Sequence, residues 1–200
     1  MKRISFLVLI VLVITSLTLT SCITTTIPLT YELNEDGNGY VVSAIIKDPI
    51  MVVDGSVIPS SHEGLPVTEI KDGGFAGWKN LYCIAIPGTV EKIGSYAFGY
   101  SGLSIAMIEE GTKYIDSYAF AYSALSEIAL PSTIEYIGEG AFALCYNLST
   151  IVYGGSRADW YSIEKGFGWN ELTGNPYLVS VYCTDGIITF YGSDSMTTAQ

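Results

Sequence analysis

The chain has 200 residues, 49% of them hydrophobic, and its 20 acidic side chains outnumber the nine basic ones to give a formal net charge of −11. This length fits one domain or a short repeat array with caps, and it leaves little room for a second core. A chain with this negative charge repels nucleic acid and anionic lipid headgroups, which excludes nucleic acid as a partner. The expected partners are neutral, basic or bridged by cations.

The N-terminus has the features of an export signal. Lys2 and Arg3 precede an apolar run over residues 4–19, after which small and polar residues begin abruptly. A transmembrane helix is the alternative interpretation. The run is short for a bilayer about 30 Å thick, so we favour the export signal.

The apolar run ends in Leu19-Thr20-Ser21-Cys22, which resembles the bacterial lipobox. The resemblance implies that residues 1–21 are a signal peptide and that a lipid on the Cys22 thiol attaches the protein to a membrane. Several acyl chains, at about 0.8 kcal/mol per buried methylene, would make this anchor nearly permanent. We therefore expect an exported protein, lipid-anchored to the bacterial cell envelope at the outer membrane or cell surface, with residues 22–30 as a tether.

Residues 31–63 are predicted to form an N-terminal cap. Strand-like stretches occur over residues 40–46, in part, and over residues 51–53. A turn-forming run over residues 34–39 precedes them. This run has closely spaced side-chain oxygens but lacks the distal bidentate glutamate of a calcium loop, so we interpret it as a turn.

Residues 64–153 repeat with a period of about 22 residues. Apolar columns recur in phase, and in each copy an isoleucine stands five residues before a phenylalanine. The four phenylalanines are Phe75, Phe98, Phe120 and Phe142. Such regular spacing predicts that all four rings occupy one interior column.

Each copy reads approximately L-x-x-I-x-I-P-x-x-V-x-x-I-G-x-x-A-F, which contains the spacing of a leucine-rich repeat. The alternation in Ile84-Ala85-Ile86 predicts a strand, because every second side chain of a strand points to the same face. One coil buries apolar side chains worth about 8 to 15 kcal/mol, against about 22 to 44 kcal/mol for ordering its backbone, so coils must stack. We predict a mainly β fold: a short right-handed leucine-rich-repeat solenoid of about 22-residue coils with short helical turns and caps at both ends.

Residues 154–192 are predicted to form the C-terminal cap. Strand-like runs over residues 177–183 and 187–191 flank Thr184-Asp185-Gly186, as in a hairpin. We expect Trp160 and Trp169 to cover the last open coil. Residues 193–200 are predicted to be a tail.

Several runs resemble the BspA-like leucine-rich repeat family. They are Gly64–Ile70, Ile86–Gly94, Ala97-Phe98 and the stretch from Val152 to Gly186. The resemblance covers about residues 31–192 and implies a bacterial surface protein, in a family of which several members are implicated in adhesion to host matrix or other cells. Many members carry far longer arrays, so the short array here does not favour extensive multivalent adhesion.

The remaining cysteines and the single histidine do not form an obvious chemical site. Three coils separate Cys83 from Cys145, roughly 14 Å at about 4.8 Å per strand, which is too far for a disulfide. A pair between Cys145 and Cys183 stays open. His62 has no second histidine or cysteine cluster near it in sequence, so we expect a solvated loop residue. We predict no enzyme activity, no metal and no cofactor.

Two outward faces are candidates for binding. In the first, tyrosines recur in outward columns, and tyrosine offers a large contact area with few rotors. This face comprises Lys92, Tyr114 and Tyr136, with Tyr96 over Tyr118 and Tyr100 over Tyr122. The second is the outer side of the main strands, which is unusually apolar, so that either a partner or the caps should cover it. It comprises Cys83, Ala85, Ile105, Met107, Glu127, Ala129, Thr150 and Val152.

Together these features predict a membrane-anchored binding module at the cell surface, with a protein or glycan partner and a possible role in adhesion. The alternative is a structural envelope protein that self-associates or packs with neighbouring surface proteins. The sequence does not contain a constellation of residues that would favour an enzyme.

Overall fold

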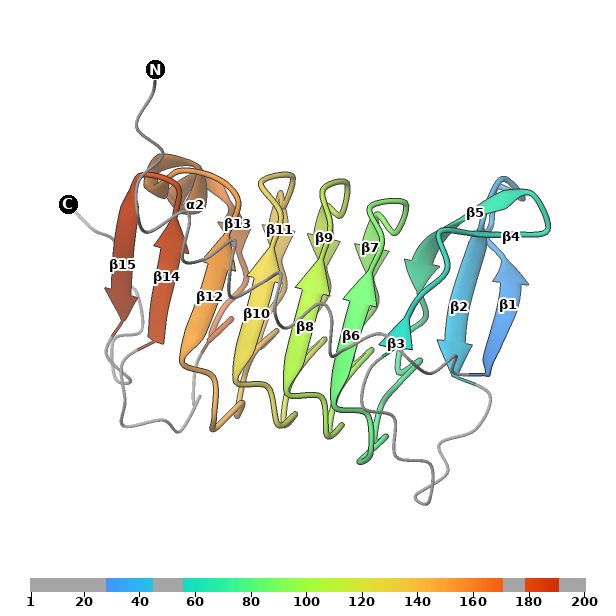
Figure 1. Ribbon diagram of the computed structural model, residues 1–200, viewed down its shortest axis with the longest axis horizontal. Coiled ribbons are helices and arrows are strands. Elements are labelled where there is room, and N and C mark those ends of the chain that lie inside the picture. The colour runs from blue at the N-terminus through green and yellow to red at the C-terminus, as the bar shows by residue number, and fades with distance from the viewer. Residues whose placement is uncertain (1–27, 45–55, 171–178, 191–200) are drawn as a thin grey trace.

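Figure 1 shows the computed structural model of the protein, which describes residues 28–44, 56–170 and 179–190. Successive coils of the chain lie side by side, and their strands form two sheets. The strands of the first sheet, here called the principal sheet, are β3 (Ser56–Val57), β6 (Cys83–Ile86), β8 (Ile105–Ile108), β10 (Glu127–Leu130), β12 (Thr150–Tyr153), β14 (Val179–Cys183) and β15 (Gly186–Phe190). The second sheet contains β1 (Leu29–Leu33), β2 (Tyr40–Ala44), β4 (Ser61–His62), β5 (Leu65–Ile70), β7 (Lys92–Ile93), β9 (Tyr114–Ile115), β11 (Tyr136–Ile137) and β13 (Glu164–Lys165).

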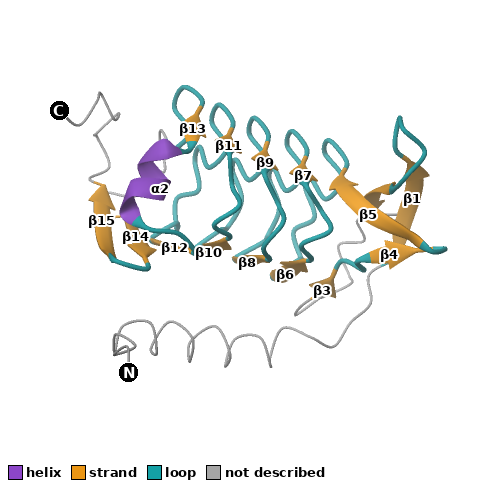
Figure 2. Ribbon diagram, turned by 90° about the horizontal axis from the view of Figure 1, so that it is seen from above, coloured by secondary structure: helices purple, strands orange, loops and turns teal. Residues whose placement is uncertain are grey.

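The order of the strands shows the winding of a solenoid. The principal sheet runs β15-β14-β12-β10-β8-β6-β3, and the second sheet runs β1-β2-β5-β7-β9-β11-β13 with β4 paired to β5. Each coil thus adds one strand to each sheet, and Figure 2 shows the two sheets on opposite sides of the array. Neighbouring coils pair in parallel, as the predicted leucine-rich-repeat solenoid requires.

The register of the strands matches the repeat read from the sequence. Ile84 pairs with Ala106, which pairs with Ile128, which pairs with Ile151. In β8, β10 and β12, buried positions alternate with half-buried ones. The repeat therefore places the same column of the sequence at the same depth in every coil.

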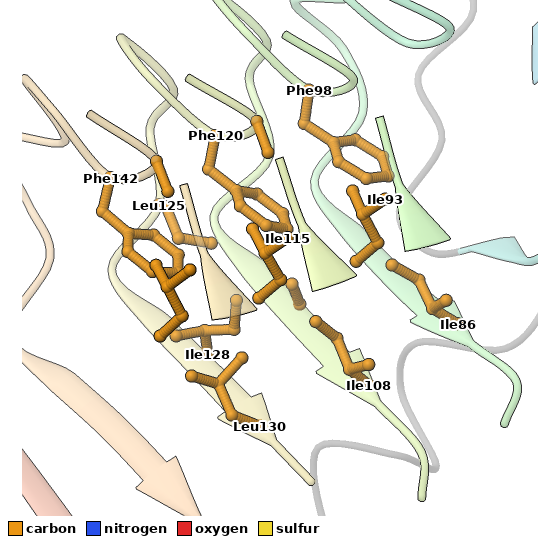
Figure 3. Close-up of a cluster of buried hydrophobic side chains, with 14 of the residues drawn as sticks. Ile86, Ile93, Phe98, Ile108, Ile115, Phe120, Leu125, Ile128, Leu130 and Phe142 are labelled. Atoms are coloured by element: carbon orange, nitrogen blue, oxygen red, sulfur yellow. The ribbon is translucent and has the colours of Figure 1, made fainter. Parts of the chain in front are cut away.

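The phenylalanine column forms the centre of the core. Phe75, Phe98, Phe120 and Phe142 are all fully buried. Their rings stack in sequence, with centroids 5.1, 5.2 and 5.5 Å apart and nearly parallel planes. Figure 3 shows three of these rings in line above the isoleucines of the sheets. The predicted single interior column is confirmed.

The third side of each coil consists of turns, here called the turn side, and these turns are also bonded from coil to coil. The amide of Phe98 donates to Ala119, and that of Phe120 donates to Ala141. Within a coil, the buried Ser101 hydroxyl donates to the Phe98 carbonyl at 2.7 Å. These buried polar groups of the turns therefore have hydrogen-bond partners, as a stable interior requires.

Hairpins close both ends of the described array. At the N-terminal end, β1 pairs antiparallel with β2, and the predicted turn over residues 34–39 joins them. At the C-terminal end, β14 pairs antiparallel with β15, as predicted. The predicted strand at 51–53 and the tail at 193–200 lie outside the described residues.

Tryptophans cover the last coil as predicted. The fully buried Trp160 lies on α2 (Arg157–Ser162), which begins with a capping box between Ser156 and Asp159. The Trp169 ring meets Phe142 edge-on with centroids 6.1 Å apart. Apart from α2, the described part of the solenoid uses turns instead of the short helical segments that we expected.

The structure answers one question left open about the cysteines and corrects two expectations, those for Cys83 and His62. Cys145 and Cys183 are free, so the disulfide left open between them is not formed. Cys83 is 2% exposed and disulfide-bonded, whereas we expected it on an outward face. His62 is not a freely solvated loop residue, because its ring lies on β4 and stacks on Tyr31 with centroids 3.7 Å apart.

Candidate functional site

Four tyrosines on the turn side form two stacked pairs. Tyr96 lies over Tyr118 with ring centroids 5.0 Å apart, and Tyr100 lies over Tyr122 with centroids 4.4 Å apart. The planes of each pair are within 11° of parallel. Tyr96, Tyr100 and Tyr122 are 40%, 47% and 41% exposed, and Tyr118 is half-buried. We call these four residues the tyrosine ridge.

The backbone of the ridge is unusual. All four tyrosines have positive φ, between 54° and 60°. This left-handed region disfavours residues with a Cβ by roughly 1 to 2 kcal/mol each and is adopted readily only by glycine. A row of bulky residues in this conformation is therefore a feature that packing alone does not favour.

At three of the four flanking positions in these columns the neighbouring coils have glycine. The Tyr96 and Tyr118 amides donate to the next coil in the same way as those of Gly73 and Gly140, which have φ of 62° and 56°. Likewise Gly77, with φ of 73°, precedes Tyr100 in the second column. The fold thus accepts glycine at these positions. Leu144, also at positive φ, follows Tyr122 in that column.

Packing fixes the ring of Tyr118 in particular. A Cβ added to Gly140 would lie 2.4 Å from Cε1 of Tyr118, so the ring covers the glycine backbone directly. The Tyr118 hydroxyl donates to Oε1 of Glu139 at 2.7 Å, and this hydrogen bond raises the pKa of Tyr118 above its usual value. Tyr118 is therefore held in place by both contact and hydrogen bonding.

The phenol groups of the ridge also interact with one another. Removal of water from around the Tyr100 hydroxyl raises its pKa, and the Tyr122 hydroxyl adds to this effect through its charge and a hydrogen bond. A weaker effect from Tyr96 reaches Tyr100 as well. The pKa of Tyr100 therefore responds to both stacked pairs, which lie in the same two coils.

The rest of the first predicted face forms a separate row on the second sheet. Lys92, Tyr114 and Tyr136 are in register on β7, β9 and β11. Lys92 forms salt bridges with Glu69 at 3.2 Å and Asp116 at 3.3 Å.

Tyrosine stacking does not extend into this row. The Tyr114 hydroxyl donates to Glu135 at 3.2 Å, which raises the pKa of Tyr114. Among the described rings, the stacked pairs do not include Tyr114 or Tyr136.

The second predicted face is less open than expected. Ala85, Ile105, Met107, Glu127, Ala129 and Val152 lie on the outer side of the principal sheet and are all half-buried. Sequence reasoning also missed some large exposed side chains. Phe167, for example, is 80% exposed and does not belong to either predicted face. The ridge is therefore distinguished by stacking of exposed tyrosines and not by having the most exposed aromatic side chains.

The charges of the described surface are unevenly matched. Its six basic side chains all contact an acidic side chain or a backbone carbonyl. Lys165 is one of these: its ammonium donates to the carbonyls of Trp160 and Ile163, while burial lowers its pKa to about 8. No salt bridge of the described region includes Glu135, Glu139 or Glu164, so the surplus charge that solvent meets is negative.

Two further searches of the described residues gave negative results. Residues 28–44, 56–170 and 179–190 do not contain a group of three or more His, Cys, Asp or Glu side chains that could hold a metal ion. No helix within those ranges is both long and apolar enough to cross a membrane. Cys22 lies outside the described residues, so the predicted lipid attachment stays a prediction.

A profile of the BspA type leucine rich repeat region matches residues 58–162 in six copies. The chain belongs to the BspA-type leucine-rich repeat family. The six copies exceed the four that the phenylalanine column reveals. Proteins built from this repeat are generally binding modules, most often for other proteins.

Solved leucine-rich repeat structures resemble this BspA-type chain. A leucine-rich repeat protein of T. pallidum is 28% identical with a TM-score of 0.59, over 70% of this chain and 62% of that one. A leucine-rich repeat protein from Bacteroides ovatus is 22% identical, with a TM-score of 0.43 over 64% of this chain and 42% of that one. A leucine-rich cell surface protein from Faecalibacterium prausnitzii is 26% identical, with a TM-score of 0.41 over 68% and 40% of the two chains. No curated protein sequence matches the chain.

Proposed function

We propose that this BspA-type repeat protein is a binding module displayed at the bacterial cell surface, and that it engages a protein partner through the tyrosine ridge. A lipid on Cys22 holds it to the membrane. The protein is not an enzyme in this proposal. Its role is recognition, with adhesion as one outcome.

One observation carries the proposal: four tyrosines have left-handed backbones in columns where Gly73, Gly140 and Gly77 take the flanking positions, with Leu144 as the one exception. Four left-handed residues together cost roughly 4 to 8 kcal/mol. Stacking returns only about 0.5 to 1.5 kcal/mol for each of the two pairs. Strained residues gather at functional sites, and rigid tyrosines are common anchors of protein interfaces. Recognition is therefore the favoured reason for their presence.

The charges of the chain favour a neutral or basic partner. Glu139, which accepts the Tyr118 hydroxyl, borders the ridge and lacks a salt bridge to any described side chain. An ionised carboxylate has acceptor capacity for further hydrogen bonds. A partner with exposed Lys or Arg side chains would therefore meet complementary charge, whereas nucleic acid would be repelled.

The first experiment tests the ridge. Proteins from host matrix and from intact envelopes are screened against the mature lipoprotein in detergent, and the Kd is measured for each identified partner. The variant Tyr100→Gly with Tyr122→Gly should raise that Kd about tenfold or more, which corresponds to about 1.4 kcal/mol. Its urea midpoint should stay close to that of the parent protein, because glycine removes the backbone strain.

The matched control is Tyr161→Ala, which removes an exposed tyrosine on α2, away from the ridge. This variant should bind as tightly as the parent. Equal Kd values for the ridge variant and the parent would refute the proposal. Binding to glycans alone, or only concentration-dependent self-association in sedimentation, would also contradict a protein partner.

The second experiment tests the anchor. Cys22→Ser should leave the protein unprocessed or soluble, because the thiol that receives the lipid is gone. Normal processing with unchanged membrane retention would contradict lipidation. Intact-mass analysis of the parent protein is the control, because a lipid on Cys22 adds the mass of its acyl chains.

A further inference from the structure

The stacked tyrosine pairs have a chemical consequence that does not depend on binding. Parallel phenol rings 4.4 Å apart, as in Tyr100 and Tyr122, lie close enough for two phenoxyl radicals to meet without diffusion of the chain. Both rings are exposed, so an external oxidant can reach them. Exposed side chains reorient within nanoseconds, which lets the ortho carbons of adjacent rings come into contact.

We propose that the tyrosine ridge is a site of oxidative cross-linking, at which a haem peroxidase with hydrogen peroxide converts Tyr100 and Tyr122 into dityrosine. Each phenol gives up one electron to the oxidised haem and one proton to a base or solvent. The two radicals then form a carbon–carbon bond between their ortho positions, and the displaced ring hydrogens return the phenol oxygens to hydroxyl groups. In total, two hydrogen atoms leave the protein while one peroxide is reduced to two waters.

The ridge also supplies an acceptor for the protons. The carboxylate of Glu139 accepts the Tyr118 hydroxyl at 2.7 Å, within the range in which a base takes up a proton. Oxidation of Tyr118 can therefore release its proton directly to Glu139. Tyr96 stacks on Tyr118 with centroids 5.0 Å apart, which makes this pair a second and slower site of coupling.

The product would connect two successive coils covalently. The cross-linked residues are 22 positions apart, so the bond closes a loop of about one coil and restricts the unfolded chain as a disulfide does. It would also join rings that already stack, with little rearrangement of the fold. The expected effect is a higher urea midpoint for the oxidised protein than for the untreated protein.

The test is oxidation of the mature lipoprotein in detergent by a haem peroxidase and hydrogen peroxide. The expected product is a monomer that has lost two hydrogens and shows dityrosine fluorescence, with a yield independent of protein concentration. Peptide mapping should place the main link between Tyr100 and Tyr122. Tyr122→Phe keeps the stacked ring and should lower the yield several-fold, and adding Tyr118→Phe should abolish the remainder.

The matched control is Tyr146→Phe, because Tyr146 is exposed but makes no ring contact within the described residues. This variant should give the parent yield of the monomeric product. If the parent forms only linked dimers, or if Tyr122→Phe matches its monomeric yield, the proposal is wrong.

Discussion

Replacing Phe98 with alanine tests the packing on which the solenoid depends. The Phe98 ring is fully buried and stacks on Phe75 at 5.1 Å and on Phe120 at 5.2 Å. Truncation of a buried phenylalanine typically costs about 3 to 5 kcal/mol. Two aromatic neighbours are lost at once, each pair being worth about 0.5 to 1.5 kcal/mol, so we expect a value of about 4 to 5 kcal/mol.

The assay is urea unfolding of the protein followed by circular dichroism. Phe98→Leu, which keeps most of the volume, should cost only about 1 to 2 kcal/mol and remains measurable if the alanine variant does not fold. Phe167→Ala removes an exposed phenylalanine and should change the free energy of unfolding by less than about 0.5 kcal/mol. A cost below about 1 kcal/mol for Phe98→Ala would refute the interior column as a source of stability.

Three further predictions concern single positions. A Cβ on Gly102 would lie 1.8 Å from the Lys79 carbonyl oxygen, so Gly102→Ala should lower the free energy of unfolding in urea by about 3 kcal/mol. Gly77→Ala places its Cβ in open space and should cost only about 1 kcal/mol of backbone strain. Equal costs for the two variants would contradict the close approach at Gly102. Burial raises the pKa of the Cys145 thiol from 9.0 to about 11. Because the folded state holds this proton more tightly, stability should fall as the pH rises through 9 to 11, and alkylation of Cys145 in the native protein at neutral pH would count against its burial. Ser156→Ala removes the N-cap of α2 and should lower the free energy of unfolding by about 1 kcal/mol in the same assay. An unchanged free energy of unfolding would contradict the cap.

The main architecture could be predicted because repeats carry their own alignment. The spacing of Phe75, Phe98, Phe120 and Phe142 is visible in the chain, and stacking equivalent positions is the physical way to bury them. The hairpin β14–β15 and the covering tryptophans followed from similarly local patterns. These predictions, which rest on period and local turn chemistry, were confirmed, whereas the outward position that the same period gave Cys83 was wrong.

Features that depend on contacts between distant residues could not be predicted in this way. His62 and Tyr31 are far apart in sequence, and only the successive pairing of β4 with β5, of β5 with β2 and of β2 with β1 brings their rings together. The free state of Cys145 and Cys183 likewise depends on where the C-terminal cap lies. No spacing rule links such pairs, because their approach is set by the folding of the caps.

The sequence alone determined the solenoid, its period and the presence of tyrosine columns, because a hydrophobic repeat dictates which side chains share an interior line. Only the tertiary structure decided that Tyr96, Tyr100, Tyr118 and Tyr122 have left-handed backbones, in columns where the neighbouring coils have mostly glycine. A backbone conformation of this kind is imposed by the turn-to-turn hydrogen bonds between coils and not by the residue that adopts it. For that reason the identity of the residues was readable from the chain, while their strain and their stacking distance were not.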